Sequence, residues 1–370
     1  MEFIDLKAQY SSIKDDVLKR IKAVLEHGHY ILGPEVNELE QKLASYVNRK
    51  HCISCANGTD ALLMALMALG VGRGDAVFTT TFTFIATAEV IALLGATPVF
   101  VDINERSFNI DPENLAEQIA KIKSESKLTP KAIIAVDLFG LPAEYDQIEK
   151  IAEENGLFLV EDGAQGFGGV YNGKKACSFG DISATSFFPA KPLGCYGDGG
   201  AVFTDDDILA EKLRSIRVHG KGTDKYDNIR LGLNGRLDTL QAAVLLSKIE
   251  IFDNELSRKE KIAEYYNANL DNSLVKPEIP ANSKSAWAQY SLCSSKRDQI
   301  MGALKQKKIP SMVYYPKPLH LQTAFSFLGH KEGDFPVAER VSRIIFSLPM
   351  HAYLTEEELG RICEGVNTTD

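Results

Sequence analysis

The chain has 370 residues, enough for one large domain with its own hydrophobic core and a smaller second domain. Hydrophobic residues make up 45% and charged residues 25% of it, as in ordinary globular proteins, and the net charge of −9 without a basic block makes nucleic acid and anionic membrane surfaces poor partners. No apolar run is long enough to span a bilayer and the N-terminus lacks a signal-peptide pattern, so we expect a cytoplasmic location.

The first part of the chain alternates between helical and strand-like segments. Apolar residues at helical spacing fill residues 11–27 and stop at Gly28, and Gly33-Pro34 opens a second helix. Strands are then predicted at 51–55, 76–79, 98–101, 132–136, 157–161, 183–187 and 200–203, and helices at 60–69, 84–94, 112–123 and 145–155. This alternation predicts an α/β fold in which helices cover a mostly parallel sheet.

The later part of the chain is less regular and richer in lysine. Helices are predicted at 207–217, 236–268, 297–307 and 355–366, with strand-like segments near 286–294 and 310–315. We therefore expect a large domain at 1–250 and a small α+β domain at 251–370. The helix that contains Thr239-Leu240-Gln241-Ala242-Ala243 has a small, apolar face suited to packing against another chain.

Lys191 and Asp162 are the candidate catalytic residues. Lys191 lies between apolar residues and the turn Gly197-Asp198-Gly199-Gly200, and Asp162 ends the buried strand-like run 158–162. A Schiff-base lysine and an aspartate that meets a pyridinium nitrogen are what pyridoxal phosphate (PLP) requires of a protein. Taken alone, Lys191 also fits a surface lysine, the commoner fate of lysine, and Asp162 also fits a simple helix cap.

The run Asn57-Gly58-Thr59 is a candidate phosphate-binding turn between a strand and a helix. Its backbone N–H groups and the Thr59 hydroxyl suit a phosphate at a helix N-terminus, although a plain N-cap fits the same residues. Ser186, five residues before Lys191, is a second candidate phosphate contact. Since the turn, Asp162 and Ser186 each lie at or just after a strand end, all three should meet at one edge of the sheet.

Two further features bear on a cofactor or metal site. Phe82-Thr83-Phe84 follows a strand, and an aromatic ring there would stack on a cofactor, although an aromatic beside a strand end more often belongs to the core. Cys52 and Cys55 form a CxxC, but no second pair or nearby histidine completes a zinc site. We therefore expect no metal, and reduced core thiols at the six cysteines.

Together these motifs resemble the DegT family of PLP-dependent nucleotide-sugar aminotransferases. The matching segments extend over nearly the whole chain and are Tyr30-Ile31-Leu32-Gly33-Pro34, Ala56 to Leu62, Phe82 to Glu89, Glu161 to Gln165, Ser186 to Gly200, Arg236 to Ala243, Tyr315-Pro316 and Leu348-Pro349-Met350-His351. The run from Phe188 to Gly200 is the most specific of them. Within the family, the chain most resembles members that act on UDP-linked 2-acetamido-3-keto-glucuronic acid.

The resemblance implies a PLP fold-type I, aspartate-aminotransferase-like architecture and a set of site residues. It makes Lys191 both the Schiff-base lysine and the base that moves the substrate proton, and it pairs Asp162 with the pyridine nitrogen. The other residues that it assigns to the cofactor are Gly58, Thr59 and Ser186 at the phosphate, Phe84 and Gln165 at the ring, and Asn234, which reaches the phosphate from a neighbouring subunit. The residues that it assigns to the substrate are Arg236, Tyr314, Tyr315 and His320, with Tyr314 standing where the family has histidine.

The implied activity is transamination in two halves, with pyridoxamine phosphate as the form of the cofactor between them. An amino donor, glutamate in the family, leaves its amino group on the cofactor, and the group then passes to a ketone on a nucleotide-linked sugar. A homodimer with shared active sites, working in cell-surface polysaccharide biosynthesis, is expected. The alternatives are a transaminase for a dTDP-linked 3- or 4-keto-6-deoxyhexose, a PLP sugar dehydratase, which Lys191 disfavours because those enzymes carry histidine there, and a non-catalytic regulator.

Overall fold

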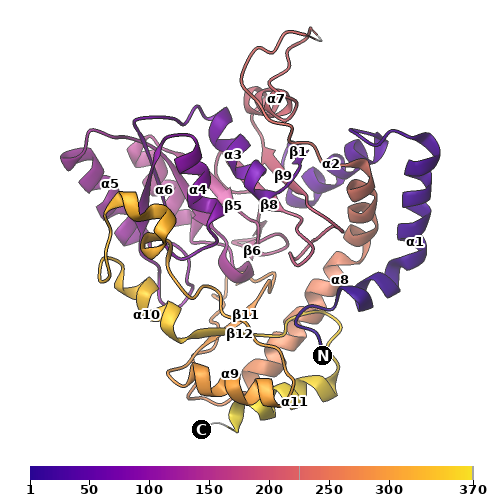
Figure 1. The fold of residues 1–370 in the computed structure, drawn as a ribbon, viewed down its shortest axis with the longest axis vertical. Helices are drawn as coiled ribbons and strands as arrows, with labels where there is room; N and C mark the ends of the chain where they lie inside the picture. The colour runs from indigo at the N-terminus through magenta and orange to yellow at the C-terminus, as the bar shows by residue number, and fades with distance from the viewer. Residues whose placement is uncertain (225, 369–370) are drawn as a thin grey trace.

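A computed structural model describes residues 1–224 and 226–368. Its centre is a seven-stranded sheet in the order β1-β9-β8-β5-β4-β2-β3, with helices on both faces (Figure 1). The strands are β1 His51–Cys55, β2 Asp75–Thr80, β3 Thr97–Val101, β4 Thr129–Val136, β5 Phe158–Asp162, β8 Ile182–Ser186 and β9 Gly200–Thr204. Only β9 runs antiparallel to its neighbours in this sheet. The predicted α/β fold with a mostly parallel sheet is confirmed.

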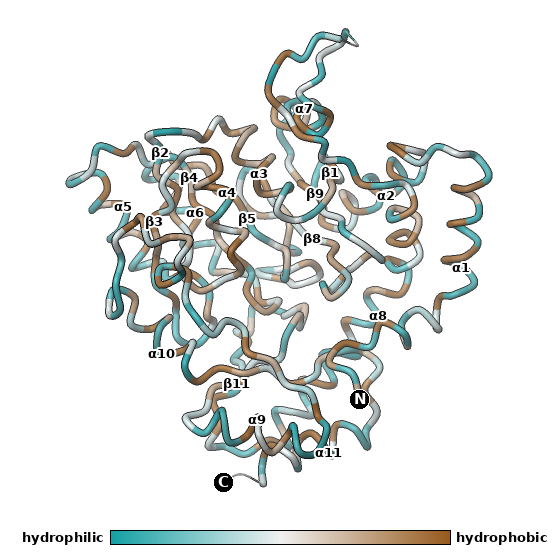
Figure 2. Tube along the Cα trace, viewed as in Figure 1, coloured by the Kyte–Doolittle hydropathy of each residue, from teal (hydrophilic) through white to brown (hydrophobic). Residues whose placement is uncertain are grey.

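The helices of the large domain follow the predicted order with small shifts at their ends. They are α1 Leu6–His27, α2 Pro34–Val47, α3 Gly58–Ala68, α4 Ala86–Leu93, α5 Pro112–Glu125, α6 Tyr145–Asn155 and α7 Asp207–Ile216. Hydrophobic and hydrophilic residues alternate along α1 in Figure 2, because one side of this helix packs on the rest of the chain through Ile13 and Val17. Among the described residues, no helix is long and apolar enough to cross a membrane.

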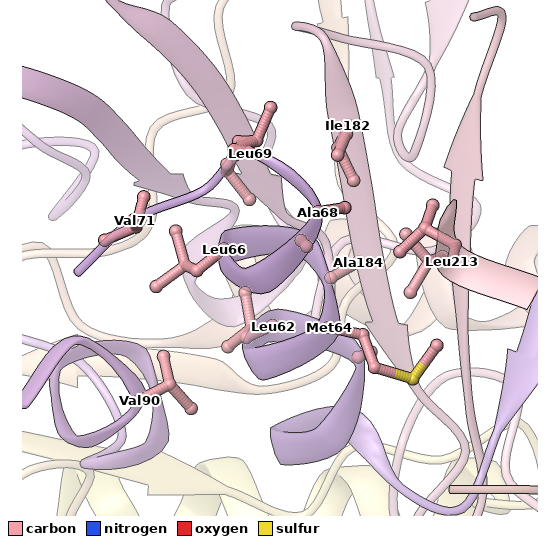
Figure 3. Close-up of a cluster of buried hydrophobic side chains, with 14 of the residues drawn as sticks. Leu62, Met64, Leu66, Ala68, Leu69, Val71, Val90, Ile182, Ala184 and Leu213 are labelled. Carbon is pink, nitrogen blue, oxygen red and sulfur yellow. The ribbon is translucent and has the colours of Figure 1, made fainter. Parts of the chain in front are cut away.

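Helix α3 lies in the hydrophobic core, and this burial fixes the turn at its start. Leu62 and Leu66 are almost fully buried and pack in one cluster with Val90, Ile182 and Leu213 from surrounding elements (Figure 3). Burying each such side chain contributes about 1.5–3 kcal/mol. The first turn of α3 is therefore held firmly at the edge of the sheet.

The long helix α8, Thr239–Asn269, joins the two parts of the molecule (Figure 1). The division expected at residue 250 falls inside this continuous helix: Phe252 packs with the large domain, whereas Ile262 packs with the small one. The small domain combines α9 Arg297–Gln306 and α11 Glu356–Asn367 with a sheet of β11 Tyr290–Cys293 and β12 Ile345–Leu348. The segment 310–315 is not a strand, since only a single bridge joins Met312 to Ser347.

Two expectations about the later part of the chain are corrected. The predicted helix at 236–268 begins at Thr239. Its small apolar face is not available to another chain, because Ala242 and Ala243 are fully buried within this chain. Elements that the prediction missed are the short strands β6 Val170–Tyr171, β7 Lys174–Lys175 and β10 Ser283–Lys284, the helix α10 Pro336–Ile344 and the strand β12. The small strands were missed because two residues carry no alternation.

Between α7 and α8 the chain leaves the body of the molecule as an arm. Figure 1 shows this segment, residues 217–238, reaching beyond α7 and returning. Bridges between Val218 and Asn234 and between Lys221 and Asn228 hold its two sides together. Leu231 is 88% exposed on this arm, so the arm carries an apolar side chain that the rest of the chain does not cover.

Candidate active site

The carboxyl ends of β1, β5 and β8 meet at one edge of the sheet. Gly200 of β9 pairs with Cys55 on one side and with Ser186 on the other, so the ends of β1 and β8 lie level with each other. Asp162 ends β5, which runs parallel to β8. The prediction that the turn after β1, Asp162 and Ser186 share one edge is confirmed.

The turn after β1 is shaped to receive an anion. The side chain of Asn57 is the N-cap and accepts a hydrogen bond from the N–H of Asp60 at 2.8 Å. The N–H groups of Gly58 and Thr59, in the first turn of the helix, have no carbonyl within the helix to bind. A Cβ at Gly58 would lie 2.6 Å from the Cβ of Ser186, so only glycine allows this approach. The N-cap interpretation thus holds for Asn57 and leaves the next two residues for a phosphate.

Asp162 is a buried carboxylate whose two oxygens are already oriented. One oxygen accepts a hydrogen bond from the Thr87 hydroxyl at 2.8 Å, and the other accepts one from the N–H of Ala164 at 3.2 Å. Burial raises the pKa of Asp162, while the Thr87 hydrogen bond and the charge of Lys191 oppose that shift. A pyridinium N–H would be a further positive partner, which favours the ionised carboxylate.

Lys191 lies in the connection between β8 and β9, where its backbone N–H donates to the carbonyl of Phe188 at 2.8 Å. Burial lowers the pKa of Lys191, and the charge of Asp162 acts against this shift. A lower pKa leaves more of the amine unprotonated near neutral pH, and only the unprotonated amine is a nucleophile. The environment of Lys191 therefore suits a residue that forms a covalent link.

Gln165 is held from both ends of its side chain. Its carbonyl accepts a hydrogen bond from the N–H of Phe139 at 2.9 Å, and its NH₂ group donates to the Tyr315 hydroxyl at 3.2 Å. Phe82 lies edge-on to Tyr315 with ring centroids 6.0 Å apart. The structure thus brings Gln165 and Tyr315 together, although they are far apart in the sequence.

The two phenylalanines after β2 have different environments. Phe82 is fully buried, whereas Phe84 is 54% exposed. The core interpretation is thus right for Phe82 and wrong for Phe84. Thr87, in the first turn of α4, donates its hydroxyl to Asp162. The sequence reasoning did not single out Thr87, because a threonine in the first turn of a helix carries no local sign of a partner 75 residues away.

The remaining substrate candidates are Arg236, Tyr314 and His320, and their surroundings differ. Arg236 donates a hydrogen bond to the side-chain carbonyl of Asn234, and Asn234 is exposed. Tyr314 packs against Phe3 of the N-terminal segment, with ring centroids 6.3 Å apart. Phe3 was not a predicted contact, and nothing in its local pattern identifies it.

His320 lies in the interior of the protein. Its imidazole is completely buried, and its two ring nitrogens lie 2.7 Å from the Thr81 hydroxyl and 3.1 Å from a carboxylate oxygen of Glu339. A substrate would have to displace one of these partners, so we remove His320 from the candidate site. The six cysteines are also buried, each with a free thiol.

Comparisons with known proteins agree with this geometry. Residues 11–367 match the DegT/DnrJ/EryC1/StrS aminotransferase family. The UDP-2-acetamido-2-deoxy-3-oxo-D-glucuronate aminotransferase of Pseudomonas aeruginosa is 48% identical over 98% of both chains. The UDP-N-acetyl-3-dehydro-alpha-D-glucosamine 3-aminotransferase of Acidithiobacillus ferrooxidans is 40% identical over 99% of this chain and 97% of its own. A pleiotropic regulatory protein of Geobacillus stearothermophilus is 43% identical over 98% of this chain and 96% of its own.

Solved structures share the fold over the whole length. An aminotransferase of the same family from Brucella abortus is 51% identical, covers 100% of this chain and 99% of its own, and superposes with a TM-score of 0.97. A sugar aminotransferase from Streptococcus pneumoniae, solved in its PLP form, is 25% identical over 96% of this chain and 95% of its own, with a TM-score of 0.88. The fold-type I architecture and the PLP cofactor are thereby confirmed. The chain belongs to the DegT/DnrJ/EryC1/StrS aminotransferase family, as a PLP-dependent sugar transaminase.

Proposed function

We propose that this enzyme transfers an amino group from glutamate to the 3-keto group of UDP-linked 2-acetamido-3-keto-glucuronic acid, in the biosynthesis of a cell-surface polysaccharide. The observation that carries the proposal is 48% identity over 98% of the chain to a protein named for that keto sugar. The expected site residues support it, since Asp162, Ser186 and the turn at Gly58 meet at one sheet edge.

The residues of this site fit PLP, which when bound supplies an electron sink for the carbon that loses its proton. The first turn of α3 with Gly58 and Thr59, together with Ser186, would hold the phosphate. Asp162, fixed by Thr87, would bind the ring nitrogen. The free hydrogen of the Gln165 NH₂ group is available to the ring oxygen, since that group uses one hydrogen on Tyr315.

Lys191 would act twice in the reaction. Its amine, more of which is unprotonated because burial lowers the pKa of Lys191, would hold PLP covalently in the resting enzyme. When the amino donor takes that place, the freed amine of Lys191 would accept the proton of the substrate carbon as a general base and give it back as a general acid. Phe84, more than half exposed at the same edge, would cover one face of the ring.

The substrate side rests on Arg236, Tyr314 and Tyr315. A guanidinium binds a carboxylate through two parallel hydrogen bonds, which suits both glutamate and a glucuronate. Tyr314 replaces the histidine of the family with a neutral hydroxyl, so it would contribute a hydrogen bond without a charge. We place the active unit as a cytoplasmic homodimer in which Asn234 completes the phosphate site of the partner.

The test is a panel of purified nucleotide-linked amino sugars with 2-oxoglutarate, which runs the reaction in reverse and avoids unstable keto sugars. UDP-linked 2-acetamido-3-amino-glucuronic acid should be consumed with the largest kcat/KM, with formation of glutamate. The panel includes the matching dTDP-linked 3-amino- and 4-amino-6-deoxyhexoses. A larger kcat/KM for one of these would overturn the proposed substrate, and no turnover of any sugar would overturn the proposed reaction.

A further inference from the structure

The loop that carries Lys191 has little regular structure of its own. It joins β8 to β9 between residues 187 and 199, where Phe187 binds Cys195 and Gly199 through backbone hydrogen bonds of 2.8 and 2.7 Å. These bonds close the base of the loop but do not fix its outer side. Leu193 and Cys195 of the loop are in the hydrophobic cluster that includes Leu245 of helix α8. Tyr196, five residues after Lys191, adds contacts with polar side chains of the same helix.

Two residues on one face of α8 hold Tyr196. Gln241 accepts a hydrogen bond from the backbone N–H of Tyr196 at 2.9 Å. Lys248, seven residues further along the helix and so on the same side, places its ammonium 4.3 Å from the centre of the Tyr196 ring. Tyr10 of α1 packs edge-on against the same ring, at 6.1 Å between centroids. The loop is thus clamped between α8 and α1 at Tyr196.

Lys248 is an unusual residue to find at this position. It is 1% exposed, and among the described residues no hydrogen-bond acceptor meets its ammonium. Buried charges are normally paired, because removing them from water is costly. The face of an aromatic ring is the partner that an otherwise unpaired cation finds in such a site. No salt bridge or hydrogen bond to a described residue accompanies the burial of this lysine. The Tyr196 ring is its direct partner, and the more distant charge of Glu255 also favours the ammonium, since it opposes the lowering of the Lys248 pKa by burial.

We propose that Lys248 is a positioning residue for Lys191: its buried ammonium holds the ring of Tyr196, and through Tyr196 it fixes the loop that carries the catalytic lysine. The inference rests on the proposed role of Lys191 in transamination. Lys248 touches neither cofactor nor substrate in this arrangement. Its effect on the reaction comes from restricting where the Lys191 amine can lie relative to Asp162.

Lys248→Met tests this directly, since it removes the charge and keeps an unbranched side chain of similar length. Hydrogen–deuterium exchange of the full-length protein without cofactor reads out the loop. We expect backbone amides of residues 188–199 to exchange about tenfold faster, equivalent to about 1.4 kcal/mol, while the strands of the central sheet are unchanged. In the holoenzyme, kcat should fall with little change in KM, and the pH midpoint of the cofactor absorbance should shift.

Lys259→Met is the matched control. Lys259 is also a buried lysine on α8, 7% exposed, but its ammonium donates to the carbonyls of Ala286 and Trp287 rather than to the loop. Because Lys259 lines the same pocket as residues 189–192, the comparison uses residues 193–199. Substitution of Lys259 should change exchange around residues 283–288 and leave residues 193–199 as in the wild type. Equal effects of the two substitutions on the loop would overturn the proposal.

Substitutions of Tyr196 give an independent test in case Lys248→Met does not fold. Tyr196→Phe keeps the ring and should leave loop exchange unchanged, whereas Tyr196→Leu should match Lys248→Met, and the double variant should add nothing further. Additive effects, or unchanged loop exchange in Lys248→Met, would overturn the positioning role. Failure of the proposed function is recognised separately, because it would appear as no turnover of any sugar by the wild type, or as turnover in Lys191→Ala, whereas loop exchange is measured without substrate or cofactor.

Discussion

At the scale of single residues, burial shifts the pKa values of the two candidate catalytic groups in opposite directions. Burial raises the pKa of Asp162 and lowers that of Lys191, so each is pushed toward its neutral form, and the charge of each opposes the shift of the other. Bound PLP would change this balance, because Lys191 would no longer carry an ammonium and a pyridinium N–H would be a new positive partner for Asp162. The site is therefore electrostatically prepared for its cofactor.

Lys191→Ala should abolish steady-state transamination, because both the covalent link and the proton carrier are lost. Pyridoxamine phosphate should still bind, since the phosphate turn and Asp162 remain. The measurements are turnover with glutamate and a keto-sugar acceptor, and retention of pyridoxamine phosphate on gel filtration. More than a trace of turnover would exclude Lys191 from the mechanism.

Asp162→Asn keeps the shape of the carboxylate but removes the negative charge from the ring nitrogen. We expect a loss on the order of 3 kcal/mol in transition-state stabilisation, or roughly a hundredfold in kcat. The neighbour Glu161 is the matched control, because it points to the other side of β5 and accepts hydrogen bonds from the backbone N–H groups of Cys177 and Phe179. Glu161→Gln should lower the urea midpoint and leave the absorbance spectrum of the bound cofactor as it is.

At the scale of elements, the strand-to-helix turn depends on one close approach. A Cβ at Gly58 would lie 2.6 Å from Ser186, whereas one at Gly72 would meet nothing within 4 Å. Gly58→Ala should therefore push α3 away from β8 and weaken cofactor binding at least tenfold, as measured by equilibrium dialysis of PLP. Gly72→Ala should bind PLP like the wild type. Equal affinity in both variants would show that the turn does not hold the phosphate.

Two buried carboxyl groups lie next to each other: Asp137 follows β4 directly and Glu161 is on the neighbouring strand β5. The Tyr145 hydroxyl donates to one oxygen of Asp137 at 2.7 Å, while the other oxygen has no donor facing it and gains one only if a proton is shared with Glu161. Burial, followed by the charge of Glu161, raises the pKa of Asp137 well above 3.8. Above that pH the folded chain keeps a proton that the unfolded chain has lost, so the free energy of unfolding falls as the pH rises.

Asp137→Asn should remove part of this pH dependence. The amide supplies both the hydrogen for Glu161 and the oxygen for Tyr145 without titrating. Urea unfolding of the apoenzyme at pH 5 and pH 8 should show a smaller fall in the free energy of unfolding for the variant than for the wild type. Identical falls would mean that Asp137 is ionised in the folded chain.

At the scale of the whole molecule, the arm and Asn234 decide whether one chain can complete an active site. The carbonyl of Gly235, next to Asn234, accepts a hydrogen bond from the N–H of Ala56 at 3.2 Å, so Gly235 lies beside the turn at Gly58 of its own chain. Ile229 and Leu231 on the arm are 53% and 88% exposed, and a second chain that packed on the arm would cover both. We expect Asn234 to serve the partner, in a dimer with two shared sites.

Mixing two inactive variants tests this arrangement. Lys191→Ala lacks the covalent link, and Asn234→Asp places a carboxylate against the phosphate, where like-charge repulsion weakens binding. In a shared-site dimer, reassociation gives mixed dimers with one site carrying both substitutions and one carrying neither. Activity should recover toward one intact site per mixed dimer. No recovery, with mixed dimers demonstrated by mass spectrometry, would assign Asn234 to its own chain.

The sequence by itself determined the order of the main elements and which candidate residues stand at the strand ends. Helical spacing, strand-like runs and the turns around Gly58 and Gly199 are local signals, and strand ends that follow one another in a parallel sheet must share an edge. The close match of the motifs to one family then supplied roles for Lys191 and Asp162. These are features that a short segment encodes without its partners.

The tertiary structure alone decided which distant segments meet. It buried His320 between Thr81 and Glu339, exposed Phe84 while burying Phe82, and set Lys248 against the Tyr196 ring. It also turned the apolar face at Ala242 and Ala243 into the core of its own chain. From the sequence one can infer only that an apolar face or a polar side chain needs a partner. The packing of the whole chain decides which partner it receives, because burial and hydrogen bonding are satisfied in three dimensions.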